Sequence, residues 1–363
     1  MAVPLETLWD IEPHTKAKHE ILRRYLQAWF PILNSWNDRI VYVDGFCGPG
    51  RYKGGEPGSP LITLEVAINH RQAMRGKLVF WFIDEREDRI LHLKQELKGL
   101  SIPPHFKVRP ELGKFHERLG LVLDAMETSG TNLAPTFAFI DPFGFSGIPY
   151  TLIQRLLKQE RCEAFITFMV DSINRFLEHP RDSIVRHIVD AFGTDEAIRI
   201  AESSGNRIEK LRVLYQNQLR RVAKFVRYFE MRDQEDRTQY YLFFATNNEL
   251  GHLKMKEAMW RVDPGGEFRF SDETNPNQRV LFEFDPTTIL AKELGDRFRG
   301  KGLIPVSTVH KYVENETAYL EKHMRNALRE EARTGRVTVD PIKVGGQKRR
   351  VNTFPDDARI TFT

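Results

Sequence analysis

The stretch Arg39-Ile-Val-Tyr-Val-Asp-Gly-Phe-Cys-Gly-Pro-Gly50 decides the fold of this chain. Its first half is an apolar run that ends in an acid, which predicts a buried strand over Arg39–Asp44. Three glycines follow within six residues, and they permit a tight turn in which backbone N–H groups approach a ligand closely. The stretch therefore predicts the first strand of an α/β sheet, with a ligand-binding turn at its carboxyl end.

Similar apolar runs recur along the chain and alternate with helical patterns. The helical patterns begin with His14–Phe30 and continue with Leu61–Asn69 and a charged segment that ends near Lys98. Strands that are apolar along their whole length indicate a parallel sheet covered on both faces. We therefore predict a doubly wound, Rossmann-like α/β sheet. Its further strands are Leu78–Asp84, His105–Arg109, Thr136–Asp141, Ala164–Val170, Gln239–Ala245 and Val280–Phe284.

Two segments depart from this rhythm. A polar, helix-favouring stretch at about 172–235 is too long for one crossover and predicts a helical insertion. From residue 286 the pattern changes to helical segments followed by two short strands around a Gly345-Gly346 turn. Three helices and a two-stranded wing are typical of a winged helix, so we predict an α/β domain over 1–285 and a winged-helix-like module over 286–363. The segments of this module are Thr287–Arg299, Ser307–Tyr312, Ala318–Glu331, Val337–Val339 and Arg350–Phe354.

Charge is divided unevenly between these two parts. The whole chain has 54 Lys and Arg against 50 Asp and Glu, but residues 286–363 have 15 against 10 and residues 1–285 have 39 against 40. The basic excess includes Lys348-Arg349-Arg350 beside the predicted wing. It indicates a contact of the C-terminal module with DNA, RNA or an acidic protein face.

Composition excludes several classes of protein. A hydrophobic fraction of 41% excludes wholesale disorder. No apolar run reaches the roughly 18 residues needed to cross a bilayer, and Met1–Asp10 lacks the basic start and apolar run of a secretory signal. Cys47 and Cys162 are too few for a disulfide framework or a zinc site. We expect a cytoplasmic protein with no bound metal and no membrane contact.

The glycine loop after the first strand carries the sharpest chemistry. No Gly-Lys-Ser/Thr follows it, so it is not a P-loop, and its glycine spacing differs from the dinucleotide fingerprint. It resembles the first motif of class I methyltransferases, in which the loop wraps the amino-acid end of S-adenosylmethionine. That resemblance implies a cofactor role for Asp44, Gly45, Phe46, Gly48 and Gly50. The alternative is a tight turn without a ligand.

Two later acids extend the predicted cofactor site. Asp84 ends the second strand, where an acid accepts hydrogen bonds from both ribose hydroxyls of a nucleoside cofactor. The alternatives for Asp84 are a solvated acid or a helix N-cap. The neighbouring Glu85 is the other candidate for binding the ribose. Glu111, after the third strand, is the candidate for the adenine edge, unless it is a first-turn helical carboxylate.

Asp141-Pro-Phe-Gly144 emerges from the carboxyl end of the fourth strand, where doubly wound sheets bind ligands. It resembles the Asp/Asn-Pro-Pro-Tyr/Phe motif of amino-methylating enzymes, although Phe143 replaces the second proline. The resemblance implies that Asp141 orients a target amine or accepts its proton, and that Phe143 or Phe145 stacks on a flat substrate. The alternative is an Asx turn with apolar residues in the core.

Three further side chains are candidates for substrate contact. His14 and Lys18 lie one turn apart on the first predicted helix and would overhang the cofactor or substrate, unless they are merely solvated. Gly58-Ser59 predicts a turn followed by a helix N-terminus, where Ser59 would meet an anionic group.

The whole sequence is similar to the three-Cys-motif partner family (TcmP). That resemblance implies a class I methyltransferase-like fold and a companion protein that carries three cysteines. The matching stretches are His14–Leu22, Val43–Gly50, Gly58–Pro60, Phe139–Gly144, Met255–Trp260, Thr317 and Arg349-Arg350.

These motifs together predict a methyltransferase that uses S-adenosylmethionine. The substrate class they favour is a nucleobase or nucleic acid, methylated on an amino group, with the companion three-cysteine protein as partner. The alternatives are a catalytically silent partner protein that keeps the fold, and a methyltransferase for a small molecule or peptide.

Overall fold

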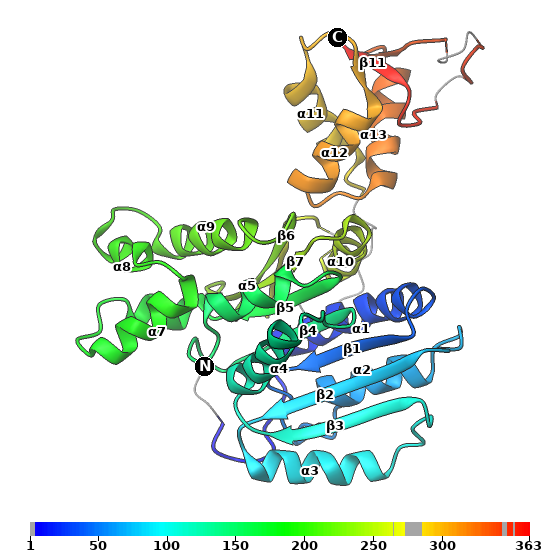
Figure 1. The fold of residues 1–363 in the computed structure, drawn as a ribbon. Helices are drawn as coiled ribbons and strands as arrows, with labels where there is room; N and C mark the ends of the chain where they lie inside the picture. Colours follow the sequence, from blue (N-terminus) through cyan, green and yellow to red (C-terminus); the bar gives the residue numbers. More distant parts are fainter. Residues whose placement is uncertain (1–3, 264, 273–284, 343–346, 351–352) are drawn as a thin grey trace. The chain divides into compact units, whose positions relative to one another are not determined.

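The structure is a computed structural model, and it describes residues 4–263, 265–272, 285–342, 347–350 and 353–363 (Figure 1). The chain divides into two compact units. The N-terminal unit comprises Met1–Ala258 with Arg269–Asn275, and the C-terminal unit comprises Met259–Phe268 with Pro276–Thr363. Within the described ranges, no helix is long and apolar enough to cross a membrane.

A mixed sheet organises the N-terminal unit. Its described strands have the order β3-β2-β1-β4-β5-β7-β6-β8. Strands β1 to β5 are mutually parallel, whereas β7 runs antiparallel to both β5 and β6. The predicted doubly wound α/β sheet is therefore confirmed. The strands are β1 (Arg39–Asp44), β2 (Lys77–Asp84), β3 (Phe106–Leu112), β4 (Thr136–Ile140), β5 (Cys162–Phe168), β6 (Phe225–Arg232), β7 (Thr238–Thr246) and β8 (Arg269–Ser271).

Helices cover both faces of this sheet, which is why its strands are apolar along their whole length. On one face, Phe137 of β4 packs against Tyr25 of α1, with ring centroids 5.2 Å apart. On the other face, Ala138 and Ile140 join a buried cluster with residues of the helices that follow β3, β4 and β5. The helices are α1 (Pro13–Asn34), α2 (Ser59–Ile68), α3 (Glu87–Lys98), α4 (Phe115–Ser129), α5 (Tyr150–Lys158), α6 (Val170–Phe176), α7 (Asp182–Phe192), α8 (Glu196–Arg199), α9 (Arg207–Arg220) and α10 (Glu249–Val262).

Helix α1 continues past Pro31, where the sequence pattern had predicted its end near Phe30. Proline has no N–H, so the carbonyl of Gln27 loses its helical partner. His70 compensates, because its Nε2 lies 3.1 Å from that carbonyl oxygen. A side chain distant in the sequence thus lets the helix extend to Asn34.

The helical insertion predicted for 172–235 is shorter than expected. Helices α7, α8 and α9 do lie together at one side of the unit (green in Figure 1). Residues Phe225–Arg232, however, form β6, which pairs with β7 and β8. Polar residues such as Arg227 and Glu230 interrupt the apolar ones in this strand, so it lacks the continuous apolar run of the parallel strands. The strand predicted at Val280–Phe284 lies outside the described residues.

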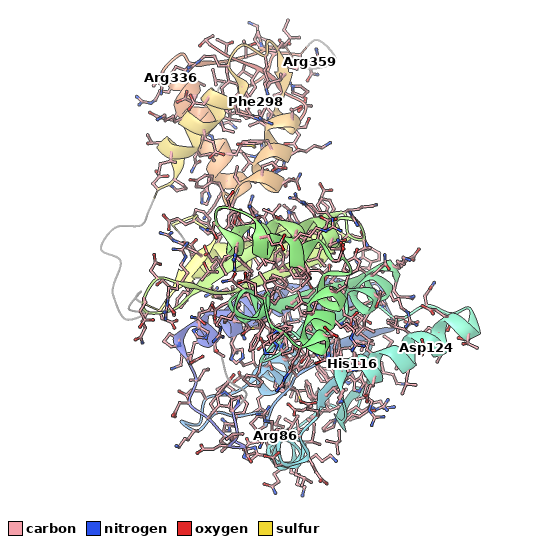
Figure 2. All side chains as sticks on the ribbon, turned by 90° about the vertical axis from the view of Figure 1, so that its left-hand side faces the viewer. Arg86, His116, Asp124, Phe298, Arg336 and Arg359 are labelled. Carbon is pink, nitrogen blue, oxygen red and sulfur yellow. The ribbon has the colours of Figure 1, made fainter. Side chains whose placement is uncertain are left out.

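The C-terminal unit has its own apolar core. Phe298, labelled in Figure 2, stacks on Phe362 with ring centroids 5.7 Å apart. Strand β11 lies between β10 and β9 and is antiparallel to both. The elements are α11 (Thr287–Phe298), β9 (Ile304–Pro305), α12 (Val306–Glu316), α13 (Glu321–Arg333), β10 (Val337–Val339) and β11 (Arg359–Phe362).

The terminal hairpin predicted for this unit is partly wrong. Strand β10 is where the sequence predicts it, but it pairs with β11 and not with Arg350–Phe354. Buried Ile360 and Phe362 alternate with outward residues and give β11 its strand pattern, whereas Phe354 is a single buried anchor. The predicted Gly345-Gly346 turn and residues 351–352 lie outside the described part of the chain.

Candidate active site at the carboxyl ends of the strands

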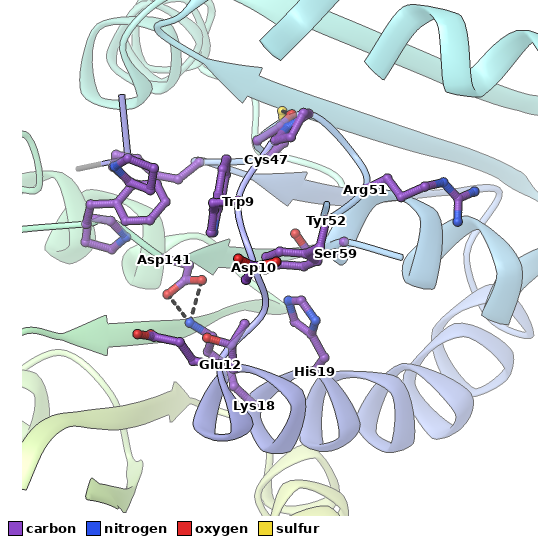
Figure 3. Close-up of a pocket in the computed structure, with 18 of the residues that line it drawn as sticks. Trp9, Asp10, Glu12, Lys18, His19, Cys47, Arg51, Tyr52, Ser59 and Asp141 are labelled. Atoms are coloured by element: carbon purple, nitrogen blue, oxygen red, sulfur yellow. Dashed lines mark hydrogen bonds and ion pairs between the residues drawn. The ribbon is translucent and has the colours of Figure 1, made fainter. Parts of the chain in front are cut away.

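Two cavities, each of about 410 Å³, lie at the carboxyl ends of the parallel strands. The first borders α1, the glycine loop and the residues after β4 (Figure 3). The second borders the residues after β2, β3 and β4. Phe46, Pro142 and Phe143 line both cavities, so the two cavities adjoin across these residues, and we refer to them together as the two halves of a cleft.

The glycines of the loop are required by its conformation and its close packing. Gly48 and Gly50 have φ angles of +63° and +87°, which favour glycine. A Cβ on Gly45 would lie 2.6 Å from the Phe115 ring, and one on Gly48 would lie 3.4 Å from Trp9. Gly45 therefore has no room for a Cβ, whereas Gly48 is favoured by its positive φ angle. Gly45, Phe46 and Gly48 line the cleft, whereas Gly50 packs against Leu93 instead.

Asp44 lies beneath this loop and does not line either cavity. It is fully buried, and its Oδ1 accepts a hydrogen bond from the Phe46 N–H at 3.3 Å. Burial raises the pKa of Asp44 to about 7, although the neighbouring Ser59 hydroxyl opposes this shift. Among the described residues, Oδ2 has no hydrogen-bond partner of good geometry. Asp44 thus supports the loop from below in this state.

Cys47 is unsuited to act as a nucleophile in this loop. Its side chain lines the first cavity and is buried. Burial raises the pKa of the Cys47 thiol well above its usual value, so the thiol stays protonated near neutral pH.

Asp84 ends β2 and joins the glycine loop to the second cavity. Its Oδ2 accepts the Gly48 N–H at 3.0 Å, and its Oδ1 accepts the Arg86 N–H at 2.9 Å. Burial raises the pKa of Asp84, while these N–H groups and the nearby Arg89 guanidinium oppose the shift. A carboxylate oxygen can accept two hydrogen bonds, and each oxygen of Asp84 accepts one from a backbone N–H, so acceptor capacity remains for a ligand. Glu85 lines the same cavity and is exposed.

Asp141 is held in one orientation by Lys18 and Thr167. The Lys18 Nζ lies 2.7 Å from Oδ1 and 2.6 Å from Oδ2, and the Thr167 hydroxyl donates to Oδ1 at 2.5 Å. The Lys18 side chain is 4% exposed, whereas Asp141 is 20% exposed and borders the first cavity. Figure 3 shows this pair between α1 and β4. The structure therefore brings Lys18, Asp141, Phe143 and Ser59 together around one half of the cleft.

Three other predicted residues do not line the cleft halves. His14 lies between Asp272, 2.9 Å from its Nδ1, and Glu12, 2.9 Å from its Nε2. Burial lowers the pKa of His14, but its contacts with these two carboxylates outweigh burial and raise it overall. His14 thus joins α1 to the segment after β8.

Glu111 and Phe145 also have neighbours of their own. Glu111 accepts a hydrogen bond from Trp81 Nε1 at 2.8 Å and pairs with Arg109 at 2.9 Å. Phe145 packs against Phe176, with ring centroids 5.9 Å apart. Neither side chain borders either half of the cleft.

The structure adds cleft residues that sequence patterns did not indicate. Trp9 and Tyr52 line the first cavity, although neither belongs to a recognised motif position. Trp9 reaches the cleft because Arg86 donates hydrogen bonds to the carbonyls of Pro4 and Leu5, at 2.7 and 2.9 Å, and so anchors the N-terminal segment. His19, next to Lys18 in sequence, also lines this cavity. Burial lowers the pKa of His19 to about 3, so its ring is neutral.

The sheet has a Rossmann-like α/β topology, in which the antiparallel strand β7 lies between β5 and β6. No protein-family model and no curated protein sequence matches the chain. Among the described residues, no group of three or more His, Cys, Asp or Glu side chains is arranged to hold a metal ion.

Several solved structures are similar to this chain. A Legionella pneumophila protein of the family designated DUF519 is 14% identical, with 70% of this chain and 94% of that chain covered and a TM-score of 0.41. A putative caffeoyl-CoA O-methyltransferase from Staphylococcus aureus is 9% identical, with 62% and 83% covered and a TM-score of 0.30. A human methyltransferase 10 domain containing protein is 12% identical, with 62% and 82% covered and a TM-score of 0.29. Identities and TM-scores this low assign neither a reaction nor a ligand.

Proposed function

We propose that the N-terminal unit is a methyltransferase that uses S-adenosylmethionine. The observation that carries this proposal is the two-part cleft around the glycine loop, which has Asp84 in one half and Asp141 in the other. An elongated ligand with a nucleoside at one end and an amino acid at the other fits such a cleft. The loop's resemblance to the first motif of class I methyltransferases supports the same ligand.

The residues around the cleft suit the parts of this cofactor. Asp84 and the exposed Glu85 would accept hydrogen bonds from the ribose, with Phe46 and Phe115 as apolar surface for the base. The backbone of the glycine loop and Ser59 at the start of α2 would hold the amino-acid end. The cofactor supplies a methyl group already activated on a sulfonium, so alignment in a dry pocket accounts for most of the catalysis.

For the methyl acceptor, we favour an amino group of a nucleobase or nucleic acid. The Asp141 carboxylate, fixed by Lys18 and Thr167, is an acceptor for an N–H of such an amine. Phe143 beside it offers an aromatic surface for a flat substrate. A methyltransferase for a small molecule or peptide is the second candidate, and a silent partner that keeps the fold is the third.

The C-terminal unit is proposed to be a winged-helix-like module. Its elements follow the order helix, strand, helix, helix, strand, strand. Basic residues such as Arg336 and Arg359 are exposed on it (Figure 2). We propose that this unit contacts nucleic acid, and that a companion protein with three cysteines completes the system, as the resemblance to the TcmP family implies.

Calorimetric titration of the full chain with S-adenosylmethionine tests the cofactor. We expect a Kd below about 1 mM, the range of ordinary enzyme substrates. An Asp84→Ala variant should bind at least about tenfold more weakly, because a ribose hydrogen bond to a carboxylate is lost. If the wild-type protein gives no binding heat with about 1–2 mM S-adenosylmethionine, a concentration on the order of that Kd limit, the methyltransferase proposal is refuted and the silent partner is favoured.

Radiolabelled S-adenosylmethionine tests the substrate class. We expect methyl transfer to single-stranded DNA or RNA, and loss of transfer in Asp141→Ala while cofactor binding is kept. Transfer only to small molecules or peptides would favour the second candidate. Binding of nucleic acid that weakens with salt, and that disappears on deletion of residues 286–363, would support the role of the C-terminal unit.

A further inference from the structure

Three aromatic side chains form one group beside the glycine loop. The ring centroids of Trp9 and Tyr52 are 5.6 Å apart, and those of Trp9 and Phe143 are 5.5 Å apart. Both pairs are close to perpendicular, with interplanar angles of 84° and 73°. All three rings are half-buried and line the first cavity, so they present aromatic surface to a ligand there.

A cation already lies against this group. The guanidinium of Arg89 lies 4.7 Å from the ring centroid of Trp9 and 5.2 Å from that of Phe143. Both distances are within the range of cation–π attraction. The Arg89 guanidinium lies 3.8 Å from the carboxylate of Asp84, and this negative charge partly neutralises Arg89 and so reduces its repulsion of a second cation nearby. Trp9 and Phe143 thus already contact one cation, and Arg89 borders the second cavity and not the first, which both rings line.

The charges around the first cavity also favour a cation. The acids that line it are Asp10, Glu12 and Asp141. Of the lining cations, Lys18 is engaged by Asp141, and Arg51 is engaged by Glu96 at 2.8 Å. Arg51 also donates to the carbonyl of Gly55 at 2.7 Å. Glu12 in turn lies 2.9 Å from His14 Nε2, so among the described residues the remaining negative charge of this half of the cleft comes from the exposed Asp10.

The position of Trp9 is built into the fold. Its carbonyl accepts the Lys53 N–H at 2.9 Å, and the Thr7 hydroxyl donates to Asp88 at 2.5 Å. The segment before α1 is therefore attached both to Lys53, three residues after Gly50 of the glycine loop, and to Asp88 of α3. These two hydrogen bonds hold the Trp9 indole at the cleft in the absence of a ligand.

We infer that Trp9, Tyr52 and Phe143 form an aromatic site for the positive charge of the sulfonium. This inference rests on the proposed function and adds to it a basis for selectivity. S-adenosylmethionine carries the charged sulfonium, whereas S-adenosylhomocysteine, the product after methyl transfer, carries a neutral thioether. The aromatic site holds the first more tightly than the second, so it helps to exchange spent cofactor for fresh cofactor.

The experiment is to measure the affinities of S-adenosylmethionine and S-adenosylhomocysteine for the wild type, Trp9→Leu and Trp9→Phe. Loss of one cation–π partner corresponds to a factor of about 3 to 30 in affinity. Trp9→Leu should weaken S-adenosylmethionine by that factor and S-adenosylhomocysteine by less than about twofold, and Trp9→Phe should restore most of the difference. Trp36→Leu is the matched control, because Trp36 is 86% exposed and does not line the cleft.

The ratio of the two affinities separates the outcomes. If Trp9→Leu weakens both ligands equally, Trp9 only covers the cleft and the charge-recognition role is wrong. If it weakens neither, the aromatic site is wrong altogether. A wild type that binds neither ligand contradicts the proposed function itself, whereas a wild type that binds both but does not respond to Trp9→Leu contradicts only this inference.

Discussion

The buried ion pair between Lys18 and Asp141 gives the sharpest stability prediction. Lys18→Met removes the ammonium but keeps an unbranched side chain in a site that is 4% exposed. Asp141 then keeps the Thr167 hydroxyl as a donor but loses its counter-charge. Breaking a buried pair from one side costs about 3–5 kcal/mol. Because Asp141 is 20% exposed and stays partly hydrated, we expect a cost at or just below the lower limit of that range, about 2–3 kcal/mol.

Asp141→Leu should cost at least as much, because it leaves the more deeply buried Lys18 ammonium unpaired. The double variant should therefore cost about 2 kcal/mol less than the sum of the two single variants. Urea unfolding followed by tryptophan fluorescence is the assay, since four of the five tryptophans lie in the N-terminal unit. Lys16→Met is the control: this neighbour on α1 is 57% exposed, its pair with Glu56 spans 3.5 Å, and we expect a cost below about 0.5 kcal/mol.

Additive costs, or a Lys18→Met cost no larger than that of Lys16→Met, would refute the reasoning. Either result would mean that Lys18 and Asp141 are hydrated independently and that the carboxylate is not fixed by the lysine.

Three further predictions concern the loop and the two units. Gly45→Ala should lower the free energy of unfolding by about 1–3 kcal/mol and weaken cofactor binding, because the new Cβ would lie 2.6 Å from the Phe115 ring. Thermal unfolding is the assay, and Gly120→Ala is the control because a Cβ there meets open space. The folded pKa of Asp44, about 7, exceeds its ordinary value, so the wild type should lose up to about 4 kcal/mol of stability relative to Asp44→Asn as pH rises from roughly 4 to 7; a flat difference between the two denaturation profiles would contradict this. Hydrogen bonds to carboxylates raise the pKa of His310, so the stabilisation by its charged ring is present below about pH 6.5 and is lost as the pH rises through the raised pKa. His310→Gln should therefore reduce the change in stability of the C-terminal unit over this pH range by at most about 1 kcal/mol. If the pH profile of unfolding is the same in the variant and the wild type, this prediction is wrong.

Much of the sheet could be predicted because burial on both faces leaves a local pattern in each parallel strand. Strands β1, β2, β4 and β5 are continuous apolar runs, and they lie where the sequence predicts them. Strand β6 was missed because its polar residues break such a run. The end of α1 was misplaced because its extension past Pro31 depends on His70, a contact that no local pattern contains.

The candidate site divides in the same way. Asp84 and Asp141 could be predicted as cleft residues because acids at the carboxyl ends of neighbouring parallel strands meet at one edge of the sheet. Lys18 was a candidate from its helix position, but its pairing with Asp141 depends on how α1 lies against β4. Asp44 belongs to the glycine-loop motif, yet the packing of that loop buries the Asp44 side chain below the cleft.

The sequence by itself determined the parallel strands, the glycine loop after β1 and the acids that follow β2 and β4, because strand burial and tight turns are dictated by neighbouring residues. Only the tertiary structure decided that Trp9 reaches the cleft, that Arg89 lies against its ring, and that Glu111 accepts a hydrogen bond from Trp81. These contacts join residues far apart in the chain. Their formation depends on the path of the backbone and on competition among partners, and neither leaves a periodic pattern in the sequence.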